Sequence, residues 1–246
     1  MEKAFIVIPD VHGRTFWKSV KDICPTDIPI VFLGDYLDPY EFEGITPDEA
    51  IEVFKEIIDF AKDNPNVTLL LGNHDCTYRY GRNVCNCRCN DYRYWEIRDI
   101  FKDNANMFGI VKQIAAGGKN FLLSHAGVHP MWLKNNRYTK DDIPLFNEWS
   151  MESSEKHEKF VNSLADVSYL RGGIYGTGSV VWSDIREYLS AFEPIGFEQI
   201  VGHTYIKEPV ALHGGISCID VQRVFFVGTD GVLRDYEIEK SIEYGK

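Results

Sequence analysis

In the stretch IPIVFLGDYLDPY, residues 28–40, an apolar run passes directly into two aspartates three positions apart. Residues 28–33 are apolar throughout, without the alternation of a half-exposed strand, and this is typical of a strand buried on both faces. Residues 4–8 and 67–71 have the same character, and polar residues follow each of them. Three such strands predict a sheet that is covered on both sides by other layers.

A helix is predicted between the second and third of these strands. Thr46 is the expected N-cap, Pro47 fits the first helical position, and Glu49 completes a capping box. A helical apolar stripe follows and ends before Pro65. Weaker helical patterns cover residues 92–103, 139–149 and 153–165. Further strands are predicted at residues 109–114, 120–123, 199–201, 209–212, 216–220 and 223–227.

These elements predict one α/β (α+β) domain that covers residues 1–246. The first half follows a βαβ pattern, whereas the last third is predicted as a mostly antiparallel meander with turns at Gly214-Gly215 and Asp230-Gly231. No repeat, low-complexity tract or Gly/Ser-rich linker divides the 246 residues, which suffice for one substantial core. Two packed sheets with helices outside them would satisfy both halves.

Charge and hydropathy narrow the classes of function. The net charge is −11 and the pI is about 5.1, which argues against a broad electrostatic grip on a nucleic-acid polymer. An anionic substrate would need a local positive charge, either a metal ion or a few arginines. The N-terminal apolar run is too short for a signal peptide, and no run approaches the length of a membrane span. We therefore expect a soluble, cytoplasmic protein without a membrane partner.

Polar residues that can bind metal follow five of the predicted strands. They are Asp10 and His12, Asp35 and Asp38, Asn73 and His74, His125, and His203. Sites in α/β sheets are usually built beyond the carboxyl ends of strands, and this nitrogen and oxygen set suits manganese, iron or zinc rather than calcium. Any single cluster has an alternative as turn chemistry. Recurrence at five strand ends favours a metal site, because uncompensated buried carboxylates are costly.

The clusters stand in the motifs PDVHG, GDYLDPY, GNHD, SHAG and VGHT, spread over residues 9–204. In this order and spacing they resemble the motifs of the calcineurin-like metallophosphoesterases, specifically the phosphoprotein phosphatase (serine/threonine phosphatase) branch. The later segment EPVALHGGISCID is similar to that branch as well. The resemblance implies a four-layer α/β/β/α sandwich with two mixed β-sheets.

The resemblance also implies a site of two divalent metal ions, with manganese expected first and iron or zinc as alternatives. The implied ligands are Asp10, His12 and Asp35 for one ion, and Asp35, Asn73, His125 and His203 for the other. Asp35 would bridge the two ions, and a hydroxide between them would attack phosphorus. His74 would protonate the leaving oxygen as general acid, and Asp38 would orient the His74 ring.

Two positions depart from the family pattern. Pro39 stands where the family's GDxxDRG motif has a phosphate-binding arginine, and Asp75 replaces the glutamate of GNHE. Proline has neither a charge nor an N–H, so either binding is weaker or another arginine substitutes. Arg171 is the first candidate because neighbouring glycines allow close backbone approach. Arg79 and Arg82 are the second candidates, and each of the three has an alternative as a solvated surface arginine.

Four of the six cysteines crowd one polar segment: Cys76, Cys85, Cys87 and Cys89. The CxCxC spacing of the last three is a poor match to structural zinc sites, which use gaps of two to four residues. Free thiols in a reducing cytosol are therefore favoured over a zinc or redox role. Cys24 and Cys218 are predicted as small core residues.

Three functions fit these patterns. The first is a serine/threonine protein phosphatase-like enzyme that hydrolyses phosphate monoesters in phosphorylated proteins or small molecules. The second is a dinucleoside polyphosphate hydrolase, similar to symmetrical tetraphosphatases, for which Tyr78, Tyr80 or Tyr175 would supply a platform for a base. The third is a catalytically weak regulatory or binding module, motivated by Pro39 and the thiol-rich segment. The intact set of implied ligands and the pairing of an acid with its orienting carboxylate argue against the third.

Overall fold

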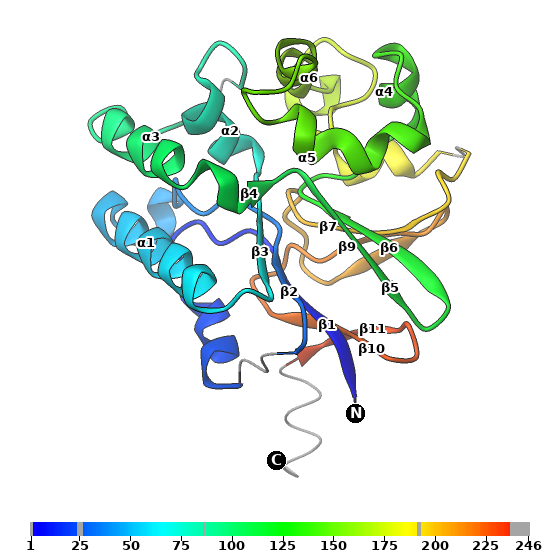
Figure 1. Cartoon of the computed structure of the whole chain (residues 1–246), viewed down its shortest axis with the longest axis horizontal. Coiled ribbons are helices and arrows are strands. Elements are labelled where there is room, and N and C mark those ends of the chain that lie inside the picture. Colours follow the sequence, from blue (N-terminus) through cyan, green and yellow to red (C-terminus); the bar gives the residue numbers. More distant parts are fainter. Residues whose placement is uncertain (1, 24–26, 86, 191–192, 237–246) are drawn as a thin grey trace.

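Two mixed β-sheets form the centre of the computed structural model (Figure 1), which describes residues 2–23, 27–85, 87–190 and 193–236. Cys24 lies outside the described residues, so its predicted place in the core is untested.

The first sheet has six strands and carries the N-terminal part of the chain. Its order is β11 (Leu233–Asp235), β10 (Phe225–Gly228), β1 (Lys3–Ile8), β2 (Ile30–Phe32), β3 (Val67–Leu70) and β4 (Phe108–Gly109). Strands β1 to β4 run parallel, whereas β10 is antiparallel to β1 and to β11. The three continuously apolar segments are therefore confirmed as neighbouring parallel strands.

The second sheet has five strands. Its order is β5 (Val111–Ala116), β6 (Lys119–Ser124), β7 (Glu198–Val201), β9 (Ile216–Cys218) and β8 (Val210–Leu212). The prediction of a mostly antiparallel C-terminal meander is wrong in part. Strand β7 is parallel to both β6 and β9, and β10 crosses to the first sheet. The apolar sequence pattern marks strands but does not fix their neighbours, because pairing depends on residues far apart in the chain.

The predicted strand at residues 109–114 is wrong as a single element, because the chain changes sheets at Ile110. Asn147 holds this crossing in place. Its Oδ1 accepts hydrogen bonds from Ile110 N (2.7 Å) and Val111 N (3.0 Å), and its Nδ2 donates to Val111 O (2.9 Å). A Cβ at Gly109 would lie only 3.0 Å from Asn147 Oδ1, so glycine makes room for this contact.

The two sheets pack face to face around an apolar interior. Phe5, Val7 and Val31 of the first sheet share one buried cluster with Phe121 and Ile200 of the second. Alternate residues of the same strands point the other way, toward the helices. This arrangement explains why these strands are apolar at every position.

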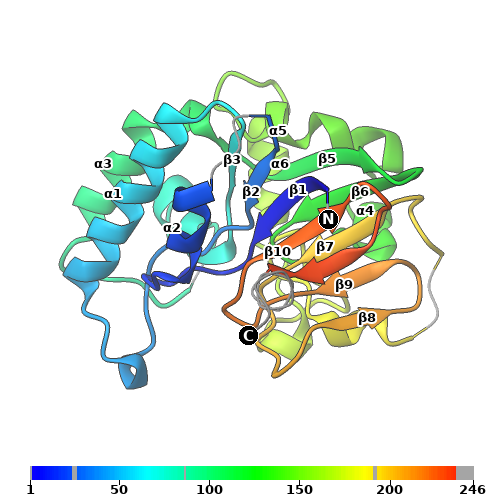
Figure 2. The ribbon, with the colours of Figure 1, turned by 90° about the horizontal axis from the view of Figure 1, so that it is seen from below.

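Helices cover the first sheet on its outer face. They are α1 (Pro47–Asp63), α2 (Asn73–Tyr80) and α3 (Tyr94–Asp103). In α1 the predicted capping box is confirmed, since Thr46 Oγ1 accepts from Glu49 N (3.2 Å) and Glu49 Oε2 accepts from Thr46 N (2.7 Å). Figure 2 shows α1 and α3 on one side of the molecule, with the second sheet on the opposite side of the first.

The remaining helices lie on the side of the second sheet (Figure 1). They are α4 (Pro130–Asn135), α5 (Phe146–Trp149) and α6 (His157–Leu164). Short 3₁₀ helices complete the chain: η1 (Phe16–Ile23), η2 (Glu41–Glu43), η3 (Ala105–Met107), η4 (Lys140–Leu145), η5 (Tyr169–Arg171) and η6 (Ile185–Tyr188). The mixed α/β class with two mixed sheets and flanking helices is thus confirmed. The helix expected at residues 139–149 is divided into η4 and α5, and α2 and α4 were not predicted. Over the described ranges, every helix is too short or too polar to cross a lipid bilayer.

Candidate metal centre

Five strand ends bring the predicted site residues together. Strands β1, β2 and β3 run parallel in one sheet and β6 and β7 run parallel in the other, so the loops that follow each group lie at one edge. These loops carry Asp10 and His12, Asp35 and Asp38, Asn73 and His74, His125, and His203. All eight side chains are buried.

Asp35 stands where two ligand groups meet. The first group is Asp10, His12 and Asp35, and the second is Asp35, His125 and His203. Asp35 Oδ2 lies 3.6 Å from His12 Nε2 and 3.5 Å from His125 Nε2. Its other oxygen, Oδ1, accepts a hydrogen bond from the His74 backbone N–H (3.0 Å). One carboxylate oxygen is therefore held by the backbone, and the other is shared between the two groups.

The second group is completed by an amide oxygen. His125 Nε2 lies 2.9 Å from Asn73 Oδ1 and 3.0 Å from His203 Nδ1. Asn73 Nδ2 donates to Cys87 Sγ (3.0 Å), which turns the amide so that its oxygen faces the histidines. Four side chains from three different loops and a helix start thus converge on one small volume.

The donor atoms of this cluster fit a bound cation. His125 Nδ1 donates to Leu33 O (3.0 Å), which assigns the ring proton to Nδ1 and leaves the Nε2 lone pair facing the oxygen of Asn73. His12 Nδ1 likewise donates to Leu37 O (2.7 Å), so its Nε2 presents a lone pair toward Asp35. Lone pairs directed at one another repel unless a positive ion lies among them. His203 Nε2 is also buried without a hydrogen-bond partner in the described structure.

The electrostatics of the cluster also favour a bound cation. Burial, reinforced by neighbouring carboxylates, raises the pKa of Asp10 and Asp35 well above the usual range. Burial also lowers the pKa of His12 and His203 well below the usual range and that of His125 to about 3. Neutral imidazoles cannot compensate buried carboxylates, so a divalent ion is the group that would. These ligand assignments stay predictions, but the residues fit the ion.

Backbone strain is concentrated at the cluster. His12, Asp35, Asp38 and His203 all have positive φ, between 45° and 63°. Such conformations cost about 1–3 kcal/mol each for residues other than glycine and persist at functional sites. Gly202 allows a further close approach, since a Cβ there would lie 2.1 Å from Asp10 Oδ1.

His74 and Asp38 form a hydrogen-bonded pair beside the cluster. His74 Nδ1 lies 2.9 Å from Asp38 Oδ2, and the His74 ring centroid lies 5.2 Å from that of His12. The Tyr78 hydroxyl donates to Asp38 Oδ1 (2.6 Å). Both carboxylate oxygens of Asp38 are therefore occupied, and the contact with Asp38 uses only Nδ1 of the His74 ring.

Asp75, one of the departures from the family pattern, fastens two of the loops together. Its Oδ2 accepts from Asp35 N (2.6 Å) and Gly72 N (2.8 Å), and its Oδ1 accepts from Tyr36 N (3.2 Å). Burial, its largest influence, raises the pKa of Asp75 to about 7. The shorter side chain thus connects the loop after β2 with the start of α2.

The three candidate arginines lie in different surroundings. Arg171 Nη2 donates to His203 O (3.1 Å), which places its guanidinium beside the cluster, although Nε is paired with Asp184 Oδ2 (2.8 Å). Arg79 pairs with Glu152 instead. Arg82 pairs with Asp91. The structure therefore brings Arg171 to the site, while the described contacts of Arg79 and Arg82 are made elsewhere.

Tyr78 and Arg14 have site contacts that the sequence analysis missed. Tyr78 was considered only as a platform for a base, whereas its hydroxyl holds Asp38. Arg14 pairs with Glu43 (Nη2 to Oε1, 2.8 Å), and its charge helps to lower the pKa of Asp10 against the dominant effect of burial. The position of Arg14 directly after the DVHG motif was a usable signal. No local sequence pattern indicates the contact of Tyr78 with Asp38.

The thiols of the CxCxC segment are free, as is Cys76. Cys76 and Cys85 are both fully buried, and Cys218 is buried as predicted. In the described part of the chain, the groups of histidine, cysteine and acidic side chains with metal-binding spacing contain no cysteine.

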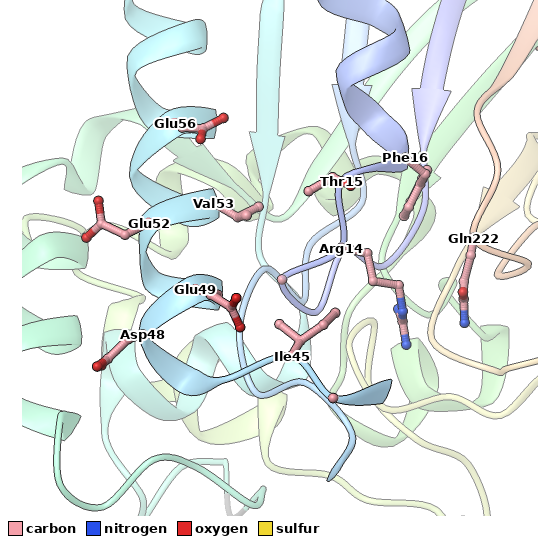
Figure 3. A pocket seen from close by; sticks show the side chains of 12 residues that line it. Arg14, Thr15, Phe16, Ile45, Asp48, Glu49, Glu52, Val53, Glu56 and Gln222 are labelled. Carbon is pink, nitrogen blue, oxygen red and sulfur yellow. The ribbon is translucent and has the colours of Figure 1, made fainter. Parts of the chain in front are cut away.

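A cavity of about 750 Å³ lies beside the cluster, between the loop after β1 and helix α1 (Figure 3). Arg14 and Gln222 line one side, while Asp48, Glu49, Glu52 and Glu56 line the helical side. None of the predicted ligands lines this cavity. Its size therefore does not make it part of the candidate centre, whose side chains lie at the strand ends.

Comparison with known proteins agrees with this geometry. Residues 4–206 match the family described as calcineurin-like phosphoesterase, and this range contains every predicted metal ligand. The chain is also 32% identical over 141 residues to a serine/threonine-protein phosphatase PP1-delta from Caenorhabditis elegans. That alignment covers 53% of this chain and 41% of the relative, so the match spans about two-fifths of the relative's length.

Proposed function

Because this chain belongs to the calcineurin-like phosphoesterase family, whose members are metal-dependent hydrolases of phosphate esters, we propose that it hydrolyses phosphate monoesters at the Asp35 centre. The observation that carries the proposal is the presence of two buried ligand groups that share Asp35. Asp10, His12 and Asp35 would hold one divalent ion. Asp35, Asn73, His125 and His203 would hold the other.

Manganese is the proposed metal, with iron or zinc as alternatives, because the ligand set mixes imidazole nitrogen with carboxylate and amide oxygen. When bound, two such ions supply positive charge for the phosphate oxygens and lower the pKa of a bound water. The chain's own contribution is to fix the ligands. Asp75 ties Asp35 to Gly72, and Leu33 O orients the His125 ring.

His74 is the proposed general acid. Asp38 holds Nδ1 of the ring and leaves Nε2 to carry the proton that the leaving alkoxide needs. Tyr78 keeps Asp38 in this orientation, since its hydroxyl occupies the second carboxylate oxygen.

Phosphoserine or phosphothreonine in proteins is the proposed substrate class. The support is the similarity to a serine/threonine phosphatase and the motif pattern of that branch. Small phosphate esters would react at the same centre. Arg171 remains a candidate for binding phosphate because its guanidinium lies beside His203. A cytoplasmic location is likewise a prediction, to be tested by fractionating cells that express the tagged protein.

A substrate panel tests this proposal. The manganese-loaded protein is assayed with a phosphothreonine peptide, p-nitrophenyl phosphate and diadenosine tetraphosphate. We expect kcat/KM for the peptide to exceed that for the dinucleotide by about tenfold or more, which corresponds to roughly 1.4 kcal/mol of transition-state binding. A preference for diadenosine tetraphosphate would instead support the dinucleoside polyphosphate hydrolase. No turnover of any of them would favour the regulatory or binding module.

A further inference from the structure

Residues 87–90, the CRCN segment, are fastened to the metal centre at their two ends. At one end Cys87 Sγ accepts the hydrogen bond from Asn73 Nδ2 (3.0 Å). At the other end Asn90 N donates to the Tyr78 hydroxyl (2.8 Å), the same group that holds Asp38. The segment therefore lies against the site rather than free in solvent, and the two residues between these anchors, Arg88 and Cys89, have defined places.

The guanidinium of Arg88 lies over the motif that lacks the family's arginine. Nη1 donates to Pro39 O (2.9 Å), and Cζ lies 4.3 Å from the centroid of the Tyr40 ring. The Tyr40 ring in turn lies 5.3 Å from the ring of His12, one of the predicted ligands. The charge of Arg88 thus stands at the edge of the centre, one aromatic ring away from it.

The charge of Arg88 is not neutralised by the protein. In the part of the chain that the structure describes, Arg88 forms no ion pair with a carboxylate, whereas Arg14 pairs with Glu43 and Arg171 with Asp184 (2.8 Å each). Its side chain is exposed, and one of its N–H groups is committed to the carbonyl of Pro39. An exposed guanidinium with open donors, next to a site for phosphate, is suited to bind that phosphate.

We propose that Arg88 binds the phosphate group of the substrate and supplies the guanidinium that Pro39 cannot. The proposal rests on the proposed phosphoesterase function and names a binding residue for it. Asp38, Pro39 and Arg88 line a cavity of about 450 Å³ that none of the predicted metal ligands lines, so the contacts of Arg88 with Pro39 and Tyr40 carry the proposal. The planar fork of the Arg88 guanidinium would bind two phosphate oxygens.

The test compares Arg88→Ala, Arg88→Lys and a matched control, Arg234→Ala. Arg234 lies on β11 and pairs with Asp230, so its replacement removes the same charge away from the centre. We expect Arg88→Ala to raise KM for p-nitrophenyl phosphate by about 10- to 100-fold, with a smaller effect on kcat, because charged hydrogen bonds to substrate are lost. Arg88→Lys should recover part of the loss, and Arg234→Ala should change KM less than twofold.

A second readout does not depend on turnover. Binding of inorganic phosphate to the manganese-loaded protein is measured by isothermal titration calorimetry, and Kd should rise by a similar factor in Arg88→Ala only. Equal Kd and KM in wild type and Arg88→Ala would overturn the proposal while leaving phosphoesterase activity intact. If wild type shows no turnover, the proposed function fails, and the phosphate Kd still decides the role of Arg88.

A rescue variant makes the assignment specific to position 39. If Arg88 stands in for an arginine at this position, Pro39→Arg introduced into Arg88→Ala should restore KM and Kd to within a few-fold of wild type. A lack of rescue, in a double variant with unchanged melting temperature and metal content, would contradict the substitution of one arginine for the other.

Discussion

His74 is the residue on which turnover should depend most. It contacts no carboxylate of the two ligand groups through its ring and is held instead by Asp38. We expect His74→Asn to lower kcat by about 10²- to 10⁴-fold, the range typical of a lost general acid. The measurement is steady-state hydrolysis of p-nitrophenyl phosphate, paired with metal content by mass spectrometry. Metal content should be unchanged, and a variant that keeps kcat within a few-fold of wild type would remove His74 from its role.

Asp184 provides a prediction about how the stability of the fold depends on pH. Burial alone would raise the pKa of this carboxyl, but hydrogen bonds from Arg186 and the charge of Arg171 outweigh it and lower the pKa. A carboxyl with a lowered folded-state pKa stabilises the fold above its unfolded pKa of about 3.9 and loses this contribution as the pH falls through the folded value. Asp184→Asn should therefore cost about 1–2 kcal/mol at neutral pH.

The cost should shrink steadily once the pH falls below about 4, because the wild-type carboxylate is then protonated too. Urea unfolding at several pH values measures it. Asp141→Asn is the control. Asp141 is exposed, and its replacement removes one charge without removing these arginine contacts. A cost that is constant down to pH 2 would show that the ion pairs do not stabilise the fold.

At the scale of helices and strands, sequence patterns predicted the features that are stabilised by contacts between residues close together in the chain. The capping box of α1 joins residues three positions apart. Continuous apolar runs in the sequence indicate the buried strands. The crossing between the sheets at Ile110 could not be predicted, because it is held by Asn147, 37 positions away. The site followed the same rule. The motifs at the strand ends predicted which side chains the fold brings together, whereas Arg88 meets Pro39 only through a contact across 49 positions.

The crossing predicts a large effect of one side chain. Asn147→Ala would leave the N–H groups of Ile110 and Val111 and the carbonyl of Val111 without their partner. Each orphaned group costs about 1–3 kcal/mol, so we expect a loss of at least about 3 kcal/mol in the free energy of unfolding, measured with urea. Asn162→Ala, an exposed change on α6, is the control and should stay within about 0.5 kcal/mol. Equal effects of the two variants would contradict the role of Asn147.

At the scale of the whole molecule, the predicted ligands join distant parts of the chain. Asp10 follows the first strand and His203 follows the seventh, and the His203 N–H donates to Asp10 Oδ1 (2.9 Å). Metal ions that bind only this assembled cluster stabilise the folded state by mass action. We expect one cooperative unfolding transition, whose midpoint falls by several degrees on chelation and recovers when manganese is restored. Two separate transitions would contradict the single domain predicted for residues 1–246.

The central claim is that the two groups sharing Asp35 hold metal for the hydrolysis of phosphate esters. The most direct measurement is the rate of p-nitrophenyl phosphate hydrolysis as manganese is titrated into metal-free protein. We expect negligible hydrolysis without metal and a rate that reaches its maximum at about two ions per chain. Hydrolysis that is independent of metal, or its absence with manganese, iron and zinc alike, would contradict it.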